Sequence, residues 1–450
     1  MVEDISQVDF PFAGRRHVRA AFDAGPISSD GGLLLVAQTD RRIGLSEALA
    51  QGLPQWRDPL RVHHPDLDLL RQRIYGICAG YEDCNDAKTM RRDPALKACC
   101  HREPDGDADL ASQPTLSRFE NEVGPKTCYR MSQALVDSYL DRHNKRPLRL
   151  ILDFDTTDDP LHGQQELRYF SAYYDEYVYL PLLIFDQDGD LIASVLQPGK
   201  SQGTRPAVAV LKRIIRRLRQ KWPGLPILVR GDSGFASPEM YRLCRDEKVD
   251  FLLGFGTNQR LKRLAAKLAE KARRRFLRTG KKARLFKTIR YRSKGTGRKR
   301  WPRSYRMIIK AEHMAEGSNV RFVVTTLPGD PEKLYDGCYV QRADASENSI
   351  KDLKRAHKAD RLSCHRFWAN QFRLLLHAAG YVLMYMLRRA AHGTELADAQ
   401  MDTLRLRLLK VGVRVQSTAR RIWFHLASCH PWQALWTLIA RRLLAPQPFH

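Results

Sequence analysis

Five short runs of hydrophobic residues, each bounded by turn residues, lie in the middle of the chain and predict β-strands. They occupy residues 148–154, 177–185, 191–196, 226–229 and 251–255. The sequence Asp186-Gln187-Asp188-Gly189 separates the second run from the third and is typical of a hairpin turn. We therefore expect the second and third strands to pair as an antiparallel hairpin.

Apolar residues with helical spacing lie between and around these strands. Thr204 and Pro206 open a segment whose apolar residues fall on one stripe, and residues 237–244 predict a second helix. Outside the central region, helices are predicted at 67–79, 113–122 and 367–387, and the chain beyond Cys364 is predicted to be helical to its end.

The order of three strands, helix, strand, helix, strand matches the ribonuclease-H-like α/β sheet, in which the first and fourth strands are neighbours. The last helix of that fold is predicted only at about 345–357, because basic and strand-like sequence intervenes. We expect an α/β fold, with a ribonuclease-H-like catalytic domain interrupted by a β-rich insertion and flanked by helical regions. The predicted regions are 1–145 (mainly helical), 146–256 (first part of the catalytic domain), 257–335 (basic β-rich insertion), 336–362 (last catalytic helix) and 363–450 (helical C-terminal region).

The charge balance points to a polyanionic partner. The 450 residues include 76 Lys and Arg against 50 Asp and Glu, a formal net charge of +26. A membrane is the rival partner, but no apolar run reaches about 18 residues without a charge. We therefore expect a nucleic-acid-binding protein with no transmembrane helix.

Most of the positive charge lies in one segment. Residues 260–310 contain 22 Lys and Arg and one acid, Glu270, for a local charge of +21. A solvated helix face usually carries both signs, whereas here aromatic residues at 276, 286, 291, 301 and 305 are interleaved with the cations. This mixture suits phosphate neutralisation together with stacking of the aromatic rings on bases or sugars. A disordered basic loop is the alternative for residues 292–300. The candidate DNA contacts of this segment are Arg273, Arg274, Arg275, Lys281, Lys282, Arg298, Lys299 and Arg300.

The nine cysteines favour neither a disulfide framework nor a zinc site. Their number is odd, and none forms a CxxC pair. The N-terminal residues include acids and lack the apolar segment of a signal peptide. We expect reduced, mostly buried thiols in a cytoplasmic protein.

Three acids are candidate catalytic groups. Asp155 ends the first predicted strand, Asp232 ends the fourth, and Glu347 lies at the start of the last catalytic helix. Adjacent first and fourth strands would bring the two aspartates together, and a helix packed on the sheet could add Glu347. Converging carboxylates need cations, and two Mg²⁺ ions about 3.5–4 Å apart, with Mn²⁺ as a substitute, would neutralise them and support phosphodiester cleavage.

Each acid also has a simpler interpretation. An aspartate after a strand is often a helix cap or a turn residue, which applies to Asp155 and Asp232 alike. Glu347 and Lys351 could form an ordinary ion pair one helical turn apart. The acids that compete with Asp155 are Asp153, Asp158 and Asp159. The combination of strand ends, insertion and charge favours the catalytic interpretation.

Several motifs in order resemble those of the bacterial insertion-sequence DDE transposases, in the branch with a β-strand insertion before the last acid. They are D-T-T at Asp155, R-G-D-S-G-F at residues 230–235, and the pattern formed by Tyr339, Arg342, Glu347 and Lys354. The sequence LDFDTTDDPLHGQQE is most similar to the family named IS thirteen-eighty. The resemblance runs from about Gly31 to Arg389.

The resemblance implies an enzyme that cleaves and transfers DNA strands with Mg²⁺, acting on terminal inverted repeats and target DNA. It implies a homodimer on DNA, in the bacterial cytoplasm and associated with the nucleoid. The resemblance also implies that residues 1–145 bind the DNA ends. By position, Asp155, Asp232 and Glu347 would be metal ligands. Tyr339, Arg342 and Lys354 would contact DNA phosphates, and Lys351 shares a helical face with Glu347 and Lys354.

The spacing departs from the related pattern at one point. The pattern has three residues between Arg and Glu, whereas four separate Arg342 from Glu347. Either the helix start carries an extra residue, or Asp344 or another neighbour shares the role. The spacing from Glu347 to Lys354 does match, which favours Glu347.

Three other functions compete with transposition. Residues 153–157 fit the DxDxT pattern of haloacid-dehalogenase-like phosphatases, in which Asp153 would be the nucleophile, but no second acid follows Asp232 directly. A ribonuclease-H-like nuclease without strand transfer is the closer alternative. The third is a non-enzymatic DNA-binding protein derived from a transposase, against which the three intact acids argue.

Overall fold

The chain folds into two compact units that are each discontinuous in sequence. The computed structural model describes residues 7–10, 18–54, 62–106, 108–172, 174–200, 204–297 and 300–445. The terminal unit comprises Met1–Arg42, Gln55–Phe119 and Leu383–His450, and the central unit comprises Ile43–Pro54 and Glu120–Val382. The predicted catalytic acids all belong to the central unit.

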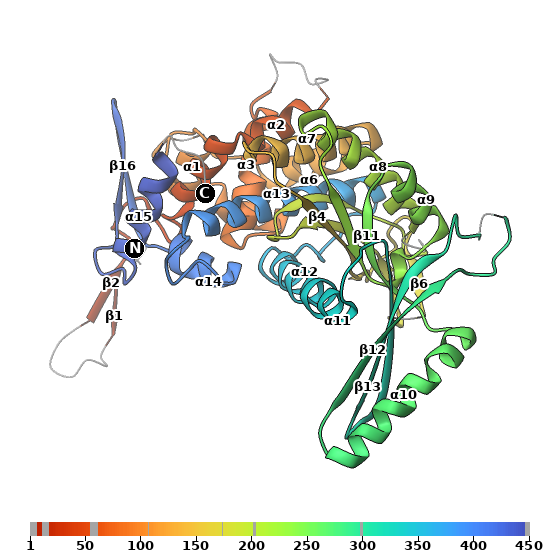
Figure 1. The fold of residues 1–450 in the computed structure, drawn as a ribbon. Coiled ribbons are helices and arrows are strands. Elements are labelled where there is room, and N and C mark those ends of the chain that lie inside the picture. Colours follow the sequence, from red (N-terminus) through yellow and green to blue (C-terminus); the bar gives the residue numbers. More distant parts are fainter. Residues whose placement is uncertain are drawn as a thin grey trace. The chain divides into compact units, whose positions relative to one another are not determined.

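An eight-stranded mixed sheet is the frame of the central unit (Figure 1). Its strands are β4 (Leu150–Thr156), β8 (Leu182–Asp186), β9 (Leu191–Val195), β10 (Ile227–Gly231), β11 (Asp250–Phe255), β12 (Ala283–Tyr291), β13 (Tyr305–Met314) and β14 (Gly317–Thr325). They lie in the order β12-β13-β14-β11-β10-β4-β8-β9. β10 is parallel to both β4 and β11, and the other neighbours are antiparallel.

The predicted strand pairings are confirmed. The first and fourth predicted strands, β4 and β10, are neighbours, and β8 and β9 form the predicted antiparallel hairpin. The second predicted run is divided, because Tyr179 ends a separate strand and Pro181 precedes β8. A small sheet contains this extra strand, with β5 (Asp159–Pro160), β7 (Glu176–Tyr179) and β6 (Tyr169–Ser171) in that order.

The two faces of β4 have different chemistry because successive side chains of a strand alternate. Leu150, Leu152 and Phe154 are buried in the main hydrophobic core, whereas Asp153 and Asp155 belong to the opposite face. The core side is covered by α7 (Pro125–Arg142), α8 (Thr204–Lys221) and α9 (Pro238–Asp246), through residues that include Tyr139, Leu211 and Met240. The α2 helix (Leu45–Gln51) packs against α7.

A continuous helical segment packs against the acidic face of the sheet. It consists of α11 (Pro331–Leu334), the π-helical turn η5 (Tyr335–Val340), α12 (Gln341–Lys351) and the π-helical turn η6 (Asp352–Ala356). Tyr335 packs with Leu228 and Leu252 of the central strands. The helix predicted at about 345–357 is therefore part of a longer helical run that begins near residue 331.

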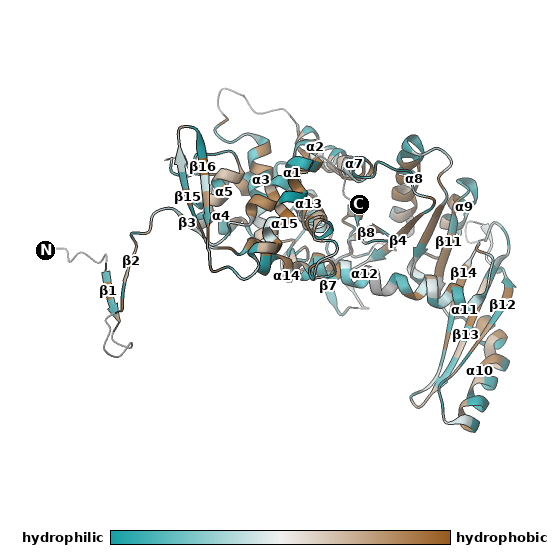
Figure 2. Ribbon diagram, turned by 60° about the vertical axis from the view of Figure 1, so that its left-hand side comes forward, coloured by the Kyte–Doolittle hydropathy of each residue, from teal (hydrophilic) through white to brown (hydrophobic). Residues whose placement is uncertain are grey.

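Residues 257–335 contain a long helix as well as strands. The predicted strands are present as β12, β13 and β14, and β14 pairs with β11, so they extend the main sheet. The α10 helix (Gln259–Thr279), which was not predicted from the sequence, lies along β12 and β13 (Figures 1 and 2). Its buried residues Leu261, Ala265 and Ala272 have helical spacing, and Figure 2 shows hydrophobic and hydrophilic positions along the helix.

The terminal unit is mainly helical. Its helices are α1 (Leu33–Ile43), α3 (Asp66–Ala79), α4 (Ala87–Met90), α5 (Pro94–Cys99), α6 (Gln113–Asn121), α14 (Met401–Leu404) and α15 (Gln433–Leu444). It also has the short turns η2 (Cys84–Asp86) and η7 (Arg405–Leu409). The α1 and α6 helices extend one and two residues beyond the bounds of the unit. The helices predicted at 67–79 and 113–122 correspond to α3 and α6. The helix predicted at 367–387 is α13 (Phe367–Ala390), which contains the boundary between the units.

The expectation that the chain beyond Cys364 is helical to its end is wrong in part. β15 (Val413–Thr418) and β16 (Arg421–Leu426) form an antiparallel hairpin, to which β3 (Ile27–Ser28) adds a third strand. A separate ribbon joins β1 (Gln7–Phe10) to β2 (Val18–Ala21). Within β15, buried valines alternate with exposed polar residues, which is the two-residue period of a strand.

The cysteines and the apolar helices bear on two expectations from the sequence. All nine cysteines are free, and six of them are buried. Within the described ranges, no helix is both long and apolar enough to span a membrane. The burial of these six cysteines agrees with the prediction of mostly buried thiols.

Candidate active site

Two of the predicted catalytic acids lie at the ends of adjacent parallel strands. The register of β4 and β10 pairs Asp153 with Arg230 and Phe154 with Gly231. Asp155 and Asp232 follow these pairs directly and so come at matching positions at the carboxyl ends of the two strands. Both line the same pocket. The convergence expected from the strand order is therefore present.

Asp155 is held by two hydrogen bonds in a largely buried position. Its Oδ1 accepts from the backbone N–H of Thr156 at 2.9 Å, and its Oδ2 accepts from Nη1 of Arg342 at 3.2 Å. Burial raises the pKa of Asp155 to about 6, the positive charge of Arg342 opposes this rise, and the negative charge of Asp232 adds to it. The carboxylate is thus one that a cation would stabilise.

Asp232 lies where β10 turns into the short helical turn η3 (Ser233–Phe235). Its Oδ1 accepts from the backbone N–H of Gly234 at 2.9 Å, so the residue also has the turn-forming role that the sequence allowed. Gly254 of β11 gives this turn room. A Cβ atom at Gly254 would lie 2.5 Å from Oη of Tyr339 and 3.0 Å from the backbone nitrogen of Ser233.

Glu347 lies on α12 and is the most exposed of the three acids. Its side chain is 65% exposed, and its Oε2 lies 3.4 Å from Nζ of Lys351. The stretch from Arg342 to Glu347 is regular α-helix, and the π-helical turns lie before and after it. The side chain of Asp344, the alternative ligand, lies outside the described side chains.

A pocket of about 550 Å³ brings Asp155, Asp232 and Glu347 together. Its other lining residues are Thr156, Thr157, Arg342, Ile350, Lys351, Lys354, Arg355 and Asp360. Lys354 donates from Nζ to Oγ1 of Thr157 at 3.3 Å and lies 3.3 Å from Oδ1 of Asp158. The pocket therefore combines carboxylates with cations, as a site for a metal ion and a phosphate requires.

The predicted cations are placed at the pocket, but they contact its acids in this structure. Arg342 pairs with Asp155, and Lys351 pairs with Glu347. The Arg342 guanidinium carbon lies 5.9 Å from the ring centre of Tyr339.

Five further lining residues were not predicted as site residues: Thr156, Thr157, Ile350, Arg355 and Asp360. Arg355 follows Lys354 directly and could have been included on that ground. Nothing in the local sequence singles out Asp360, which the fold brings to the pocket.

The acids that competed with Asp155 have other surroundings. Asp153 is 1% exposed and forms a two-pronged ion pair with Arg230, with both N···O distances at 2.6 Å. This burial argues against Asp153 as the nucleophile of a phosphatase. Asp158 pairs with Lys354, and burial raises the pKa of Asp159 well above its usual range. Of the four, Asp155 is the one that lines the pocket.

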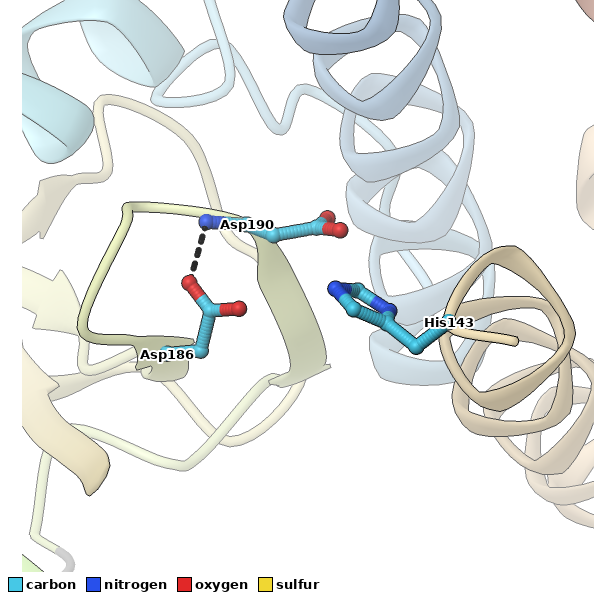
Figure 3. A group of neighbouring side chains, drawn as sticks. All are labelled: His143, Asp186 and Asp190. Carbon is cyan, nitrogen blue, oxygen red and sulfur yellow. Dashed lines mark hydrogen bonds between the residues drawn. The ribbon is translucent and has the colours of Figure 1, made fainter. Parts of the chain in front are cut away.

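The carboxylates of the pocket fit a hard divalent cation such as Mg²⁺, which prefers oxygen ligands. The raised pKa of Asp155, to which Asp232 contributes, indicates a mutual repulsion that such a cation would relieve. The three acids are more widely spaced than the ligands of a closed site. Among the described residues, the trio with ligand atoms within 4.8 Å of one another is instead His143, Asp186 and Asp190 (Figure 3).

The predicted DNA-binding cations of the basic segment lie on α10 and at the loops and strands beyond it. Arg273 and Arg274 both pair with Glu270, while Arg275, Lys281 and Arg300 are exposed. Lys282 lies 3.2 Å from the buried carboxylate of Glu312, so its charge is partly compensated. Arg298 and Lys299 lie outside the described residues.

The aromatic residues of the basic segment are mostly part of the core, which corrects the expectation that they stack on nucleotides. Tyr291, Trp301 and Tyr305 are 3–4% exposed and belong to the main hydrophobic cluster. Tyr241 of α9 and Phe251 of β11 pack against this group. These three aromatic residues therefore pack in the hydrophobic core and are not available to stack on nucleotides.

Comparison with known proteins identifies the family. The family described as Transposase DDE domain group 1 matches residues 10–447. Comparison with curated proteins gives no match. Among solved structures, the cryo-EM structure of a piggyBac transposase synaptic complex with hairpin DNA is similar at 12% sequence identity, with 92% of this chain and 82% of that chain covered and a TM-score of 0.43. Because the family match spans nearly the whole chain, this protein belongs to the DDE transposases of domain group 1.

Proposed function

We propose that this protein is a DNA transposase that cuts the ends of an insertion sequence and joins them to target DNA with the help of Mg²⁺. The observation that supports it best is the pocket that Asp155, Asp232, Glu347 and Arg342 share. The proposal includes a ribonuclease-H-like catalytic domain and membership of the IS thirteen-eighty branch. We also propose that the protein is bacterial, lies in the cytoplasm and associates with the nucleoid.

Asp155, Asp232 and Glu347 are the residues that would hold the metal. Two Mg²⁺ ions would supply activation of the attacking oxygen and stabilisation of the leaving oxygen. Mn²⁺ is the expected substitute, since it accepts the same oxygen ligands. Asp155 must be ionised to bind an ion, so its raised pKa sets a lower limit on the working pH.

The cations of the pocket position the DNA backbone. Arg342 offers a planar guanidinium that can hold a phosphate with two hydrogen bonds, and it lies against Asp155. Lys354 and Lys351 present ammonium groups one helical turn apart, and Tyr339 lies beneath Arg342. A metal ion held by Asp155 would leave Arg342 free to bind the phosphate next to the scissile bond.

The exposed cations of α10 and β12 extend the DNA-binding surface. Neutralising phosphates with Lys and Arg releases counterions, which contributes most of the non-specific affinity of such proteins. Arg275 and Lys281 are exposed, so they are suited to this role. The proposed partners are the terminal inverted repeats and target DNA, held by a homodimer because transposition joins two ends.

The proposed reaction consists of two phosphoryl transfers. In the first, water attacks a phosphorus atom at the element end, and the bond to the 3′ oxygen breaks to leave a 3′-hydroxyl. In the second, this hydroxyl attacks a phosphorus atom of the target, a new phosphodiester forms, and a target 3′-hydroxyl leaves. Both steps need the same arrangement of carboxylates and cations, so one pocket can serve them in turn.

The experiment that tests the proposal is a cleavage assay with the purified full-length protein. The substrate is a labelled duplex that carries the sequences flanking this coding region, incubated with Mg²⁺, and the nicks are mapped at nucleotide resolution. We expect cleavage at defined ends, and we expect Asp155→Asn, Asp232→Asn and Glu347→Gln each to abolish it while DNA binding persists. Asp246→Asn, which changes a surface acid of α9, is the matched control and should cleave normally.

The outcomes separate the alternatives. Binding without any cleavage in Mg²⁺ or Mn²⁺ would contradict the proposal and favour a non-enzymatic DNA-binding protein. Cleavage that survives Glu347→Gln but not Asp344→Asn would move the third ligand to the neighbouring acid. Cleavage that is lost on none of these changes would place the active site elsewhere.

A further inference from the structure

A second group of metal-ligating side chains lies in the central unit, away from the catalytic pocket. His143 follows the last residue of α7, Asp186 ends β8, and Asp190 precedes β9 (Figure 3). One ligand atom from each lies within 4.8 Å of the other two. Ligands around an ion with bonds of about 2.1 Å are separated by about 3–4 Å, so small side-chain movements would close the group on a metal.

The histidine presents its outer nitrogen to the two carboxylates. Nδ1 of His143 lies 2.8 Å from the backbone oxygen of Tyr139, and because a carbonyl oxygen only accepts, Nδ1 carries the proton. In the neutral ring this leaves Nε2 with a lone pair. Figure 3 shows one ring nitrogen directed toward Asp190 and Asp186. This is the tautomer and orientation that a metal-binding histidine needs.

An unsatisfied oxygen points to a ligand at this position. Asp190 is 0% exposed, and its Oδ1 accepts from Nη2 of Arg142 at 2.7 Å. Its Oδ2 is buried and has no hydrogen-bond partner among the described residues. A buried carboxylate oxygen without a partner is costly, and a bound cation is one way in which proteins satisfy it.

The hydrogen-bond partners of Asp186 hold its carboxylate in place, as the groups around a metal site hold its ligands. Asp186 accepts from the hydroxyl of Tyr139 at 3.1 Å with Oδ2 and from the backbone N–H groups of Asp188 and Asp190 with Oδ1. The ion pair of Asp190 with Arg142 supplies one positive charge beside two neighbouring carboxylates. Tyr139 therefore orients both His143 and Asp186, and Arg142 orients Asp190, as outer groups orient the ligands in metalloproteins.

We propose that His143, Asp186 and Asp190 bind one first-row divalent cation of the kind that accepts mixed nitrogen and oxygen ligands, with Zn²⁺ or Mn²⁺ as its best representatives. The ion ties the end of α7 to the β8–β9 hairpin. Because β8 pairs with β4, which carries Asp155, the tie supports the catalytic sheet from the side away from the pocket. The site is distinct from the proposed Mg²⁺ site and shares no residue with it.

The test uses full-length protein without a histidine tag, in which Asp155→Asn and Asp232→Asn remove two of the three catalytic carboxylates. The protein is stripped with a chelator and titrated calorimetrically with Zn²⁺ and, separately, with Mn²⁺. We expect one equivalent to bind, and His143→Gln and Asp190→Asn to lower the affinity at least tenfold. His392→Gln, which changes an exposed histidine of the terminal unit, is the control and should leave binding unchanged.

Two further readouts keep the test independent of folding. Co²⁺ bound through an imidazole and two carboxylates should give visible absorption bands that His143→Gln abolishes. Tyr139→Phe keeps all three ligands but removes the hydroxyl that orients Asp186, and it should weaken binding about 10- to 100-fold. Circular dichroism of each variant checks its fold. The proposal is overturned if the parent binds no ion, or if folded His143→Gln binds as tightly as the parent, in which case the imidazole serves only as a partner of the carboxylates.

Discussion

Arg342 and Asp155 form an ion pair across 3.2 Å, although 187 positions separate them in the sequence. The arginine comes from α12 and the aspartate from the end of β4, so the pair joins the helix to the acidic face of the sheet. Both side chains are largely buried, with 9% and 20% of their surfaces exposed. A metal ion on Asp155 would compete with Arg342 for the same oxygen, so under the proposed function this pair would link metal binding to DNA binding.

Replacement of Arg342 by lysine should impair both end cleavage and joining. Lysine keeps the charge but cannot copy the planar fork that binds one phosphate through two hydrogen bonds. We expect the rate of cleavage to fall at least tenfold, measured under single-turnover conditions with excess protein. Arg355→Lys, at another arginine that lines the pocket, is the matched comparison and should have the smaller effect. Equal effects of the two changes would argue against a special role for Arg342.

The raised pKa of Asp155 predicts a specific pH dependence of stability in the metal-free protein. The pKa is about 6 in the folded chain and 3.8 in a free side chain, so the folded state takes up this proton first as the pH falls. The resulting stabilisation is complete below pH 3.8 and is lost as the pH rises to about 6. By this reasoning Asp155→Asn should raise the free energy of unfolding at pH 8 by up to about 3 kcal/mol.

Urea unfolding in the presence of a chelator measures this difference. The gain from Asp155→Asn should be present at pH 8 and should shrink as the pH is lowered from 6 toward 4. A gain that is the same at all pH values, or a loss at pH 8, would contradict the assigned ionisation. The change Asp232→Asn removes one of the charges that raise the pKa of Asp155, so it should increase the free energy of unfolding at pH 8 by a smaller amount.

Gly254→Ala should disturb the active site without a direct change to any acid. The added Cβ would lie 2.5 Å from Oη of Tyr339 and 3.0 Å from the backbone nitrogen of Ser233, so the turn that carries Asp232 must shift. We expect cleavage to fall by 10-fold or more, since small misplacements of catalytic groups have effects of this size. Gly256→Ala meets nothing within 4 Å and should cleave at the normal rate. Similar activity in the two variants would show that the close approach at Gly254 is unimportant.

The salt dependence of DNA binding should depend on the exposed cations of the basic segment. Arg275, Arg278 and Lys281 are exposed, and their joint replacement by glutamine should reduce the slope of log K against log salt. The expected reduction is roughly 0.9 for each duplex phosphate that the variant no longer neutralises. Lys282→Gln is the comparison, because Glu312 already compensates this charge, and it should change the slope less. An unchanged slope in the triple variant would mean that this surface does not face DNA.

The central strands could be predicted from the sequence because their apolar runs are strong and local. The α10 helix was not predicted because its apolar pattern is weak. Its apolar stripe at Leu261, Ala265 and Ala272 is sparse, and the dense cations around it dominate the pattern. The β15–β16 hairpin has a clear alternation, but it lies in a region of helices and is paired with β3 from the other end of the chain. Pairings across such separations leave no local signal.

In the candidate site, too, strand order could be predicted from the sequence, whereas contacts between distant residues could not. Asp155 and Asp232 could be placed together because strand order fixes which strand ends are neighbours. The partner of each cation could not be predicted, since Arg342 and Lys354 reach acids nearly 200 residues away. The hairpin turn at residues 186–189 was predicted as a turn, but nothing nearby indicated that His143 lies against it.

The joining of precut ends tests the central claim most directly. Duplex ends with a free 3′-hydroxyl, taken from the sequences that flank this coding region, are incubated with the protein, Mg²⁺ and a supercoiled plasmid. We expect joined products that the wild-type protein forms and Asp232→Asn does not. If precut ends are bound and uncut ends are nicked, yet no joined product forms, the account is contradicted, and a ribonuclease-H-like nuclease without strand transfer becomes the better description.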